Sequence, residues 1–228
     1  MATTTTAHVG ENSLEGARLD PTLRGMTERV QGLYSLLQER MTRPQTTWGG
    51  NVSVLDDPEL VGAPLVVRRA KAFEKALMEM PIAIEGDDRI IGNNILDGVE
   101  VRTLLPTYAT AEEYDRASDE GASISAHLAH KTPHYSTLID RGLANVIADI
   151  DAKLAEIGAR PESTERDEKL ALFEAMRIEC MAVIGLAHRY ADLAESMAAQ
   201  TSDLERRAEL KTAAGIFRNV PEQAAQSF

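Results

Sequence analysis

The chain has 228 residues, enough for one large domain or two small ones, and 36 acidic against 24 basic side chains give a formal net charge of -12. This acidity disfavours binding to nucleic-acid phosphates and to anionic membrane surfaces. The single cysteine, Cys180, excludes an internal disulfide and a cysteine-based zinc site. The first residues lack the features of a secretory signal and no long apolar run follows, so we expect a cytoplasmic protein with a disordered tail over residues 1–20.

The composition favours helices packed on helices, because aromatic residues make up only 4% of the chain. The first expected helix runs from Leu23 to about Met41, with apolar residues at three- and four-residue spacing, and a turn region follows at 44–50. A second helix begins at Pro64, which suits a first helical position, and Pro81 ends it.

The segment Ile82–Ile95 carries the strongest β signal of the sequence. Two short β-branched runs flank the turn-forming residues 86–88, a pattern typical of a hairpin or of two strands joined by a turn. The sequence therefore predicts one small β element in an otherwise helical protein.

Four more helices are expected after this element. Thr110 and Glu113 have the spacing of a capping box, which predicts a helix to about Glu120. The next helix starts beyond Pro133 and ends at Gly158, and the last one runs over Leu204–Phe217.

Between these last two helices, Thr164 is expected to cap a helix long enough to span roughly 50 Å. Leaving its apolar face in water would forgo on the order of 10 kcal/mol, so this face must pack against something substantial. The face consists of Phe173, Met176, Cys180, Val183, Ala187, Tyr190, Ala194 and Met197.

Three of the five histidines lie close together, at His127, His130 and His134. Pro133 interrupts the helix that a shared metal site would need, and no carboxylate stands at the spacing that would complete a ligand set, so we predict no metal. A structural or surface role is common for histidine. His130 is the candidate catalytic residue, because it ends a hydroxyl-rich loop where it can donate to a substrate oxygen.

Other polar and reactive side chains have simpler interpretations. Cys180 is expected to be an inert core thiol, because reactive cysteines need an exposed, polar setting. The charged segment Asp203–Arg207 with Glu209 is expected to be a solvated helix face. Arg68 and Arg69 are weak candidates for binding an anion.

Short segments spread over nearly the whole chain after residue 20 resemble, in this order, the amino-terminal portion of the glycyl radical enzymes, the pyruvate formate-lyase-like family. The matching pieces are Arg68-Arg69-Ala70, Leu77, Pro81-Ile82, Asp88-Arg89-Ile90-Ile91-Gly92-Asn93, Gly121, His130, Pro133, Tyr135, Leu138, Gly142-Leu143, Arg189-Tyr190-Ala191, Ala194, Arg207, Glu209-Leu210, Val220-Pro221 and Ser227-Phe228.

The resemblance implies a fold and a reaction. Residues 21–228 would form a mainly α, helical layer with one small β element, the amino-terminal part of the family's α/β barrel fold, incomplete without a carboxyl-terminal barrel half. The family is made of radical lyases and dehydratases that act on small polar substrates through a loop cysteine and a radical glycine, and neither motif is present here. His130 matches the histidine that lies near the substrate hydroxyl in dehydratase-type relatives, with Ala129 standing where that motif has glycine.

The resemblance also implies partners. We expect an amino-terminal fragment or split subunit that binds no cofactor itself and is not competent alone. The complete enzyme would be a homodimer with a glycyl radical, installed by an activating enzyme that uses S-adenosylmethionine. Its partners would be the carboxyl-terminal catalytic half, the activating enzyme and a small-molecule substrate, with no nucleic acid and no membrane. The alternative is a non-catalytic helical interaction or regulatory protein derived from that family.

Overall fold

The computed structural model describes residues 26–41, 46–85, 88–89, 91, 101–103, 105–121 and 134–226, and the expected tail at 1–20 lies outside this part of the chain. Within it the protein is mainly helical, as predicted. The helices are α1 (Glu28–Met41), α2 (Leu65–Glu79), α3 (Ala111–Asp119), α4 (Tyr135–Gly158), α5 (Thr164–Gln200) and α6 (Leu204–Asn219), with a short 3-10 helix at Pro58–Leu60.

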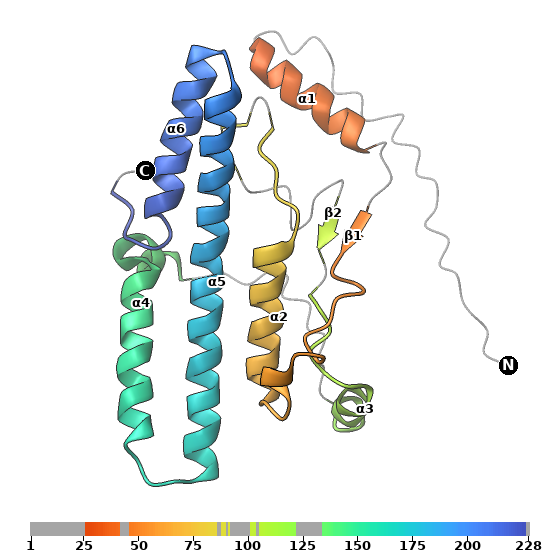
Figure 1. Cartoon of the computed structure of the whole chain (residues 1–228), viewed down its shortest axis with the longest axis vertical. Coiled ribbons are helices and arrows are strands. Elements are labelled where there is room, and N and C mark those ends of the chain that lie inside the picture. The colour runs from red at the N-terminus through yellow and green to blue at the C-terminus, as the bar shows by residue number, and fades with distance from the viewer. Residues whose placement is uncertain are drawn as a thin grey trace, which may run out of the picture.

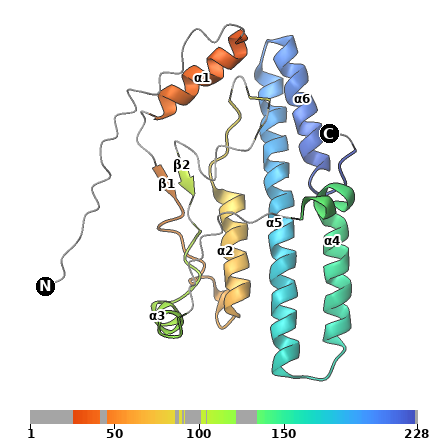
Figure 2. The same cartoon turned by 180° about the vertical axis from the view of Figure 1, so that it is seen from behind.

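The 37-residue helix α5 is the axis of the fold. Helices α4 and α6 lie end to end along one side of it, and α2 lies on the other side (Figure 1). The view from behind shows the same single layer of helices, with α3 and the two short strands beyond α2 (Figure 2). None of the helices in the described ranges is long and apolar enough to cross a membrane.

The β element predicted at Ile82–Ile95 is wrong for the residues of this segment that the structure describes, which take no strand conformation. Their polar backbone groups are used otherwise: the Asp88 carboxylate accepts from the Glu85 amide, and both residues' carbonyls accept from a distant arginine. Strand pairing occurs elsewhere. Strand β1 (Thr46–Trp48), at a place where a turn was expected, pairs in parallel with β2 (Val101–Thr103).

Most helix ends follow from the local sequence. The capping box at Thr110 and Glu113 is present in full. Pro64, expected as the first residue of the second helix, is instead the N-cap of α2, which begins at Leu65. The cap of α5 is Ser163, whose hydroxyl accepts from the Arg166 amide, so Thr164 is the first helical residue and the predicted cap was wrong by one position.

The core lies along α5 on two sides, because this helix has neighbours on both. Its buried positions are Ala175, Ile178, Ala182, Ile184, Ala187, Tyr190, Ala191, Ala194 and Ala198. The predicted stripe is therefore correct only towards the carboxyl end of α5. At the amino-terminal end it is wrong, since Met176 is exposed while Ala175 and Ile178 are buried. Alanines predominate in this core, which allows the helices to approach closely.

Candidate functional site

The structure describes only one of the three clustered histidines. His127 and His130 lie outside the described residues, so the role of His130 remains a prediction. His134 is the residue preceding α4, and its exposed side chain lies with Nδ1 2.5 Å from the Thr137 hydroxyl and Nε2 3.3 Å from the Ser136 hydroxyl. These local contacts make His134 a useful reference for testing its neighbour.

Two half-buried arginines, Arg189 and Arg206, hold the backbone from the end of α2 to Asp88. Arg189 of α5 donates to the carbonyls of Leu77 and Met80, the second at 2.8 Å. Arg206 of α6 donates to the carbonyls of Glu85 and Asp88, both at 2.7 Å. We call Arg189 and Arg206 the arginine clamp, since together they hold the last turn of α2 and the described residues that follow it, which are neither helix nor strand.

The arginine clamp was missed in the sequence, where Arg206 falls in a charged run that we interpreted as a solvated helix face. The available signal was the place of Arg189 beside Tyr190, a buried position of the apolar stripe. A charged side chain at the edge of a buried stripe needs partners, and main-chain carbonyls provide them here.

Glu209 collects three guanidinium groups from different parts of the chain. Arg29 of α1 binds its carboxylate with two nitrogens at 2.7 and 2.5 Å, Arg206 lies 3.1 Å away and Arg89 2.8 Å away. The hydrogen bonds from Arg29, followed by the one from Arg206, lower the pKa of Glu209 to about 2. Asp203, at the start of the same run, caps α6. The run therefore attaches α1 and the residues Glu85, Asp88 and Arg89 to α6.

Arg68 and Arg69, candidates for binding an external anion, bind carboxylates of this chain instead. Arg68 is buried, pairs with Glu113 through both terminal nitrogens and donates to the Tyr108 carbonyl at 3.0 Å. This pairing, with the Thr110 amide, lowers the pKa of Glu113. Arg69 pairs with Glu179 of α5 at 3.2 Å. The expected external anion is therefore the wrong partner. Acidic residues of this chain that are distant in sequence bind both arginines, and the sequence alone did not reveal them.

Helix α4 contains one residue that is not helical, Gly142, with φ 71° and ψ 164°. The carboxyl-terminal tail, residues 220–226, passes so close that a Cβ on Gly142 would lie 2.4 Å from the backbone carbon of Gln223. The Leu143 amide donates to the Pro221 carbonyl at 2.8 Å, and the Ala144 amide donates to the Glu222 carbonyl at the same distance. Only glycine fits a backbone approach of this kind.

Two further titratable groups lie along α5. Burial, and then the neighbouring Glu179, raises the pKa of Cys180, which is half-buried within the helix, so its thiol ionises less readily there. Burial raises the pKa of Tyr190 to about 12, and its ring stacks on Phe217 at 5.5 Å. Both groups stay neutral near pH 7, consistent with packing roles.

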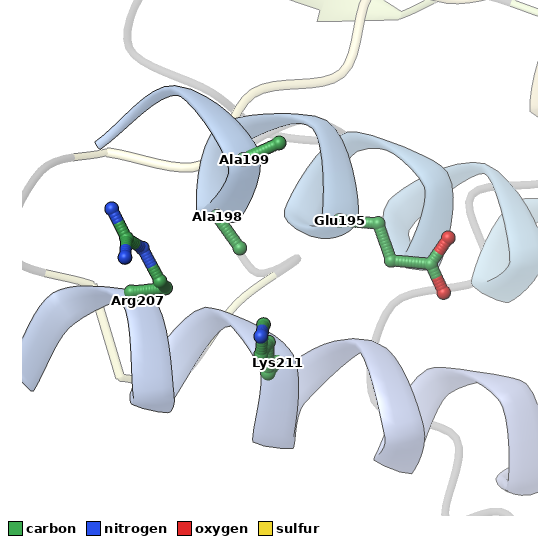
Figure 3. Close-up of a pocket in the computed structure, with 5 residues that line it drawn as sticks. All are labelled: Glu195, Ala198, Ala199, Arg207 and Lys211. Carbon is green, nitrogen blue, oxygen red and sulfur yellow. The ribbon is translucent and has the colours of Figure 1, made fainter. Parts of the chain in front are cut away.

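A shallow open groove lies between the carboxyl end of α5 and the start of α6 (Figure 3). Arg207 and Lys211 line it from α6, and Glu195, Ala198 and Ala199 line it from α5. Arg207 donates to the Thr201 carbonyl at 2.5 Å, so it closes the end of α5.

Within the described part of the chain, no three His, Cys, Asp or Glu side chains are gathered as metal ligands. Arg189, Arg206 and Arg207 each donate to main-chain carbonyls and so position backbone segments.

Several known proteins are similar to this chain in sequence. The family model described as "Pyruvate formate lyase-like" matches residues 120–228. The isethionate sulfite-lyase of Desulfovibrio desulfuricans is 34% identical, in a match that covers 75% of this chain and 28% of that protein. The isethionate sulfite-lyase of Oleidesulfovibrio alaskensis is 38% identical, over 41% of this chain and 11% of its own length.

Solved structures share the fold. A structure from work on 1,2-propanediol dehydration in Roseburia inulinivorans matches 89% of this chain with a TM-score of 0.69 and 23% identity, and the B12-independent glycerol dehydratase of Clostridium butyricum matches the same share with a TM-score of 0.66 and 19% identity. The chain spans 32% of each of these structures. By sequence and by fold, the chain is similar to the glycyl radical enzymes of the pyruvate formate-lyase-like family and spans only part of their length.

Proposed function

We propose that these 228 residues are the amino-terminal helical region of a glycyl radical enzyme, a radical lyase or dehydratase. The observation that carries the proposal is that the segments that resemble the family, although distant in sequence, contact one another in the structure. Arg189 reaches the carbonyls that precede Pro81, and Leu143 binds Pro221 across more than seventy residues. The chain spans 28% of the Desulfovibrio desulfuricans protein and 32% of the related structure, which supports a region of a larger enzyme.

The proposed substrate is a small hydroxylated molecule. The curated relatives are sulfite-lyases of isethionate, and the related structures concern dehydration of 1,2-propanediol, glycerol and trans-4-hydroxy-L-proline. All four of these molecules carry a hydroxyl group. Most of the residues that choose among such substrates are expected to lie outside this region.

In this proposal the region contributes a scaffold and one functional side chain. Radical chemistry of the family requires a loop cysteine, whereas Cys180 is set within α5 and its pKa is raised by burial. The reactive cysteine and the radical glycine would therefore come from the remainder of the enzyme. His130 would hydrogen-bond the substrate hydroxyl or transfer a proton to it, which is worth about 10²–10⁴-fold in rate for a positioned acid or base.

The complete enzyme would work in the cytoplasm as a dimer. Its glycyl radical would be installed by an activating enzyme that uses S-adenosylmethionine and an iron-sulfur cluster, so that no cofactor is bound by these residues.

Anaerobic co-expression tests the proposal. The chain is produced with the polypeptide that carries the cysteine loop and radical glycine, taken from the sequence that follows or neighbours it in the genome, together with the activating enzyme. We expect a stable complex that shows a glycyl radical by electron paramagnetic resonance and turns over a small hydroxylated substrate. Failure of the two parts to associate would refute the proposal and favour a non-catalytic helical interaction protein.

A pair of histidine variants then tests the functional side chain. His130→Ala should lower kcat at least tenfold while leaving the melting temperature of the complex unchanged. His134→Ala is the matched control, because its side chain is exposed and, among the described residues, lies against the nearby hydroxyls of Ser136 and Thr137. This variant should retain activity within about twofold. Equal activity of the two variants would assign His130 to the scaffold.

A further inference from the structure

The apolar face of α5 has an exposed section in its amino-terminal half. Leu172 is 48% exposed and Met176 41% exposed. Phe173 and Cys180, on the same face, are half-buried. We call these four residues the α5 strip: Leu172, Phe173, Met176 and Cys180. Residues three and four positions apart lie on one side of a helix, so these side chains form a continuous apolar surface.

Further along α5 the same face is buried. Tyr190 and Ala194 belong to the main core, where Ile84 and, from α6, Leu210 pack against this helix. The strip is therefore the continuation of an established interface, and it begins where the segments that cover that interface end.

Two ion pairs flank the strip and show where the neighbouring helices lie. Glu179 pairs with Arg69 of α2 on one flank, and Arg177 pairs with Asp151 of α4 at 2.9 Å on the other. Helices α4, α5 and α2 lie side by side in one layer at this height (Figures 1 and 2). Since α2 and α4 occupy the flanks, the strip faces away from both.

We infer that the α5 strip is the surface on which the remainder of the enzyme docks, the part that carries the cysteine loop and the radical glycine. This inference rests on the proposed function. An apolar centre with a rim of charged pairs is the usual anatomy of a protein interface. About two thirds of each related structure lies beyond the part matched by this chain, since the matches cover 32% of those structures, so a body large enough to cover the strip belongs to the family fold.

A second copy of the chain fits this surface less well. A stable dimer buries about 800 Å² on each partner, and four side chains, two of them already half-buried, supply far less. The remainder of the enzyme can cover the strip as one part of a larger contact.

Matched leucine-to-glutamate variants test the inference. Leu172→Glu places a charge in the strip, and Leu204→Glu places the same charge at the first residue of α6, where the leucine is 74% exposed. The probe is the remainder of the enzyme, produced as a separate tagged polypeptide, and its dissociation constant is measured by titration calorimetry. Leu172→Glu should weaken binding at least tenfold, and Leu204→Glu should change it less than twofold. Circular dichroism should show both variants folded.

The outcomes separate the inference from the proposed function. Tight binding of the wild type and equally tight binding of Leu172→Glu would overturn the strip as the docking surface and leave the proposed function standing. No binding by the wild-type chain would overturn both. Sedimentation tests the rival occupant. If the wild-type chain is a dimer and the Met176→Glu variant is a monomer, the strip binds a second copy of this chain and the inference is overturned.

Discussion

Replacing Gly142 by alanine should destabilise the protein strongly. The residue has φ 71° and ψ 164°, a backbone region that is essentially restricted to glycine and costs other residues about 1–3 kcal/mol. The new Cβ would also lie 2.4 Å from Gln223 and 2.6 Å from the Glu222 carbonyl oxygen, both main-chain atoms that have no flexible end to move aside.

The tail must therefore shift away from α4 in this variant. The amides of Leu143 and Ala144 then lose their bonds to the tail, and the Ala225 amide loses its bond to the Ile139 carbonyl. Each such hydrogen bond contributes about 0.5–1.5 kcal/mol, and the chain relieves part of the strain when it releases them. Because strain and released bonds are alternatives rather than additive terms, we expect a total loss of about 2–4 kcal/mol.

Urea unfolding followed by circular dichroism measures this loss. The matched control is Gly215→Ala in the interior of α6, where a Cβ meets nothing within 4 Å, so the variant should be stabilised by about 0.5–1 kcal/mol. Carboxypeptidase digestion gives a second measurement, since a detached tail should be trimmed faster in Gly142→Ala. A loss below about 1 kcal/mol together with unchanged trimming would refute the close packing of tail and helix.

Three further predictions concern charged and reactive groups. Arg206→Met should lower the free energy of unfolding by about 2–3 kcal/mol in urea, because two carbonyls and Glu209 lose a charged donor, whereas Arg177→Met removes an exposed pair and should cost below about 1 kcal/mol. Glu209 has a folded-state pKa of about 2 against an ordinary 4.5, so its stabilisation is complete above pH 4.5 and is lost as the pH falls towards 2. The urea midpoint of the wild type should decline more steeply over this window than that of Glu209→Gln, and parallel declines would contradict the assignment. The thiol of Cys180, with its raised pKa, should react with a disulfide reagent at pH 8 at least tenfold more slowly in the folded chain than in urea, and equal rates would place it in solvent.

Much of the helical framework could be predicted because helix ends are determined by local chemistry. The capping box at Thr110 and the proline at position 64 act through neighbouring backbone groups, and both are visible in the sequence. The length of α5 follows equally from an apolar pattern that lacks a helix breaker.

Other features depend on contacts between distant residues and could not be predicted. The break in α4 at Gly142 exists because of a tail that lies about eighty positions later. The Ile82 segment has strand-like side chains, yet its carbonyls are bound by Arg206 rather than by a second strand. Periodicity alone could not show which side of α5 faces α2, so the exposure of Met176 was missed.

The arginine clamp has a consequence for how this region tolerates change. Its guanidinium groups recognise main-chain oxygens between Leu77 and Asp88, atoms that every amino acid provides. Exposed side chains along this stretch, such as those of Pro81 and Ala83, can therefore be replaced without loosening these hydrogen bonds. Lysine cannot replace Arg189 or Arg206 with the same effect, because it lacks the two-pronged guanidinium group. A backbone held through its own carbonyls keeps its course when the exposed side chains along it change.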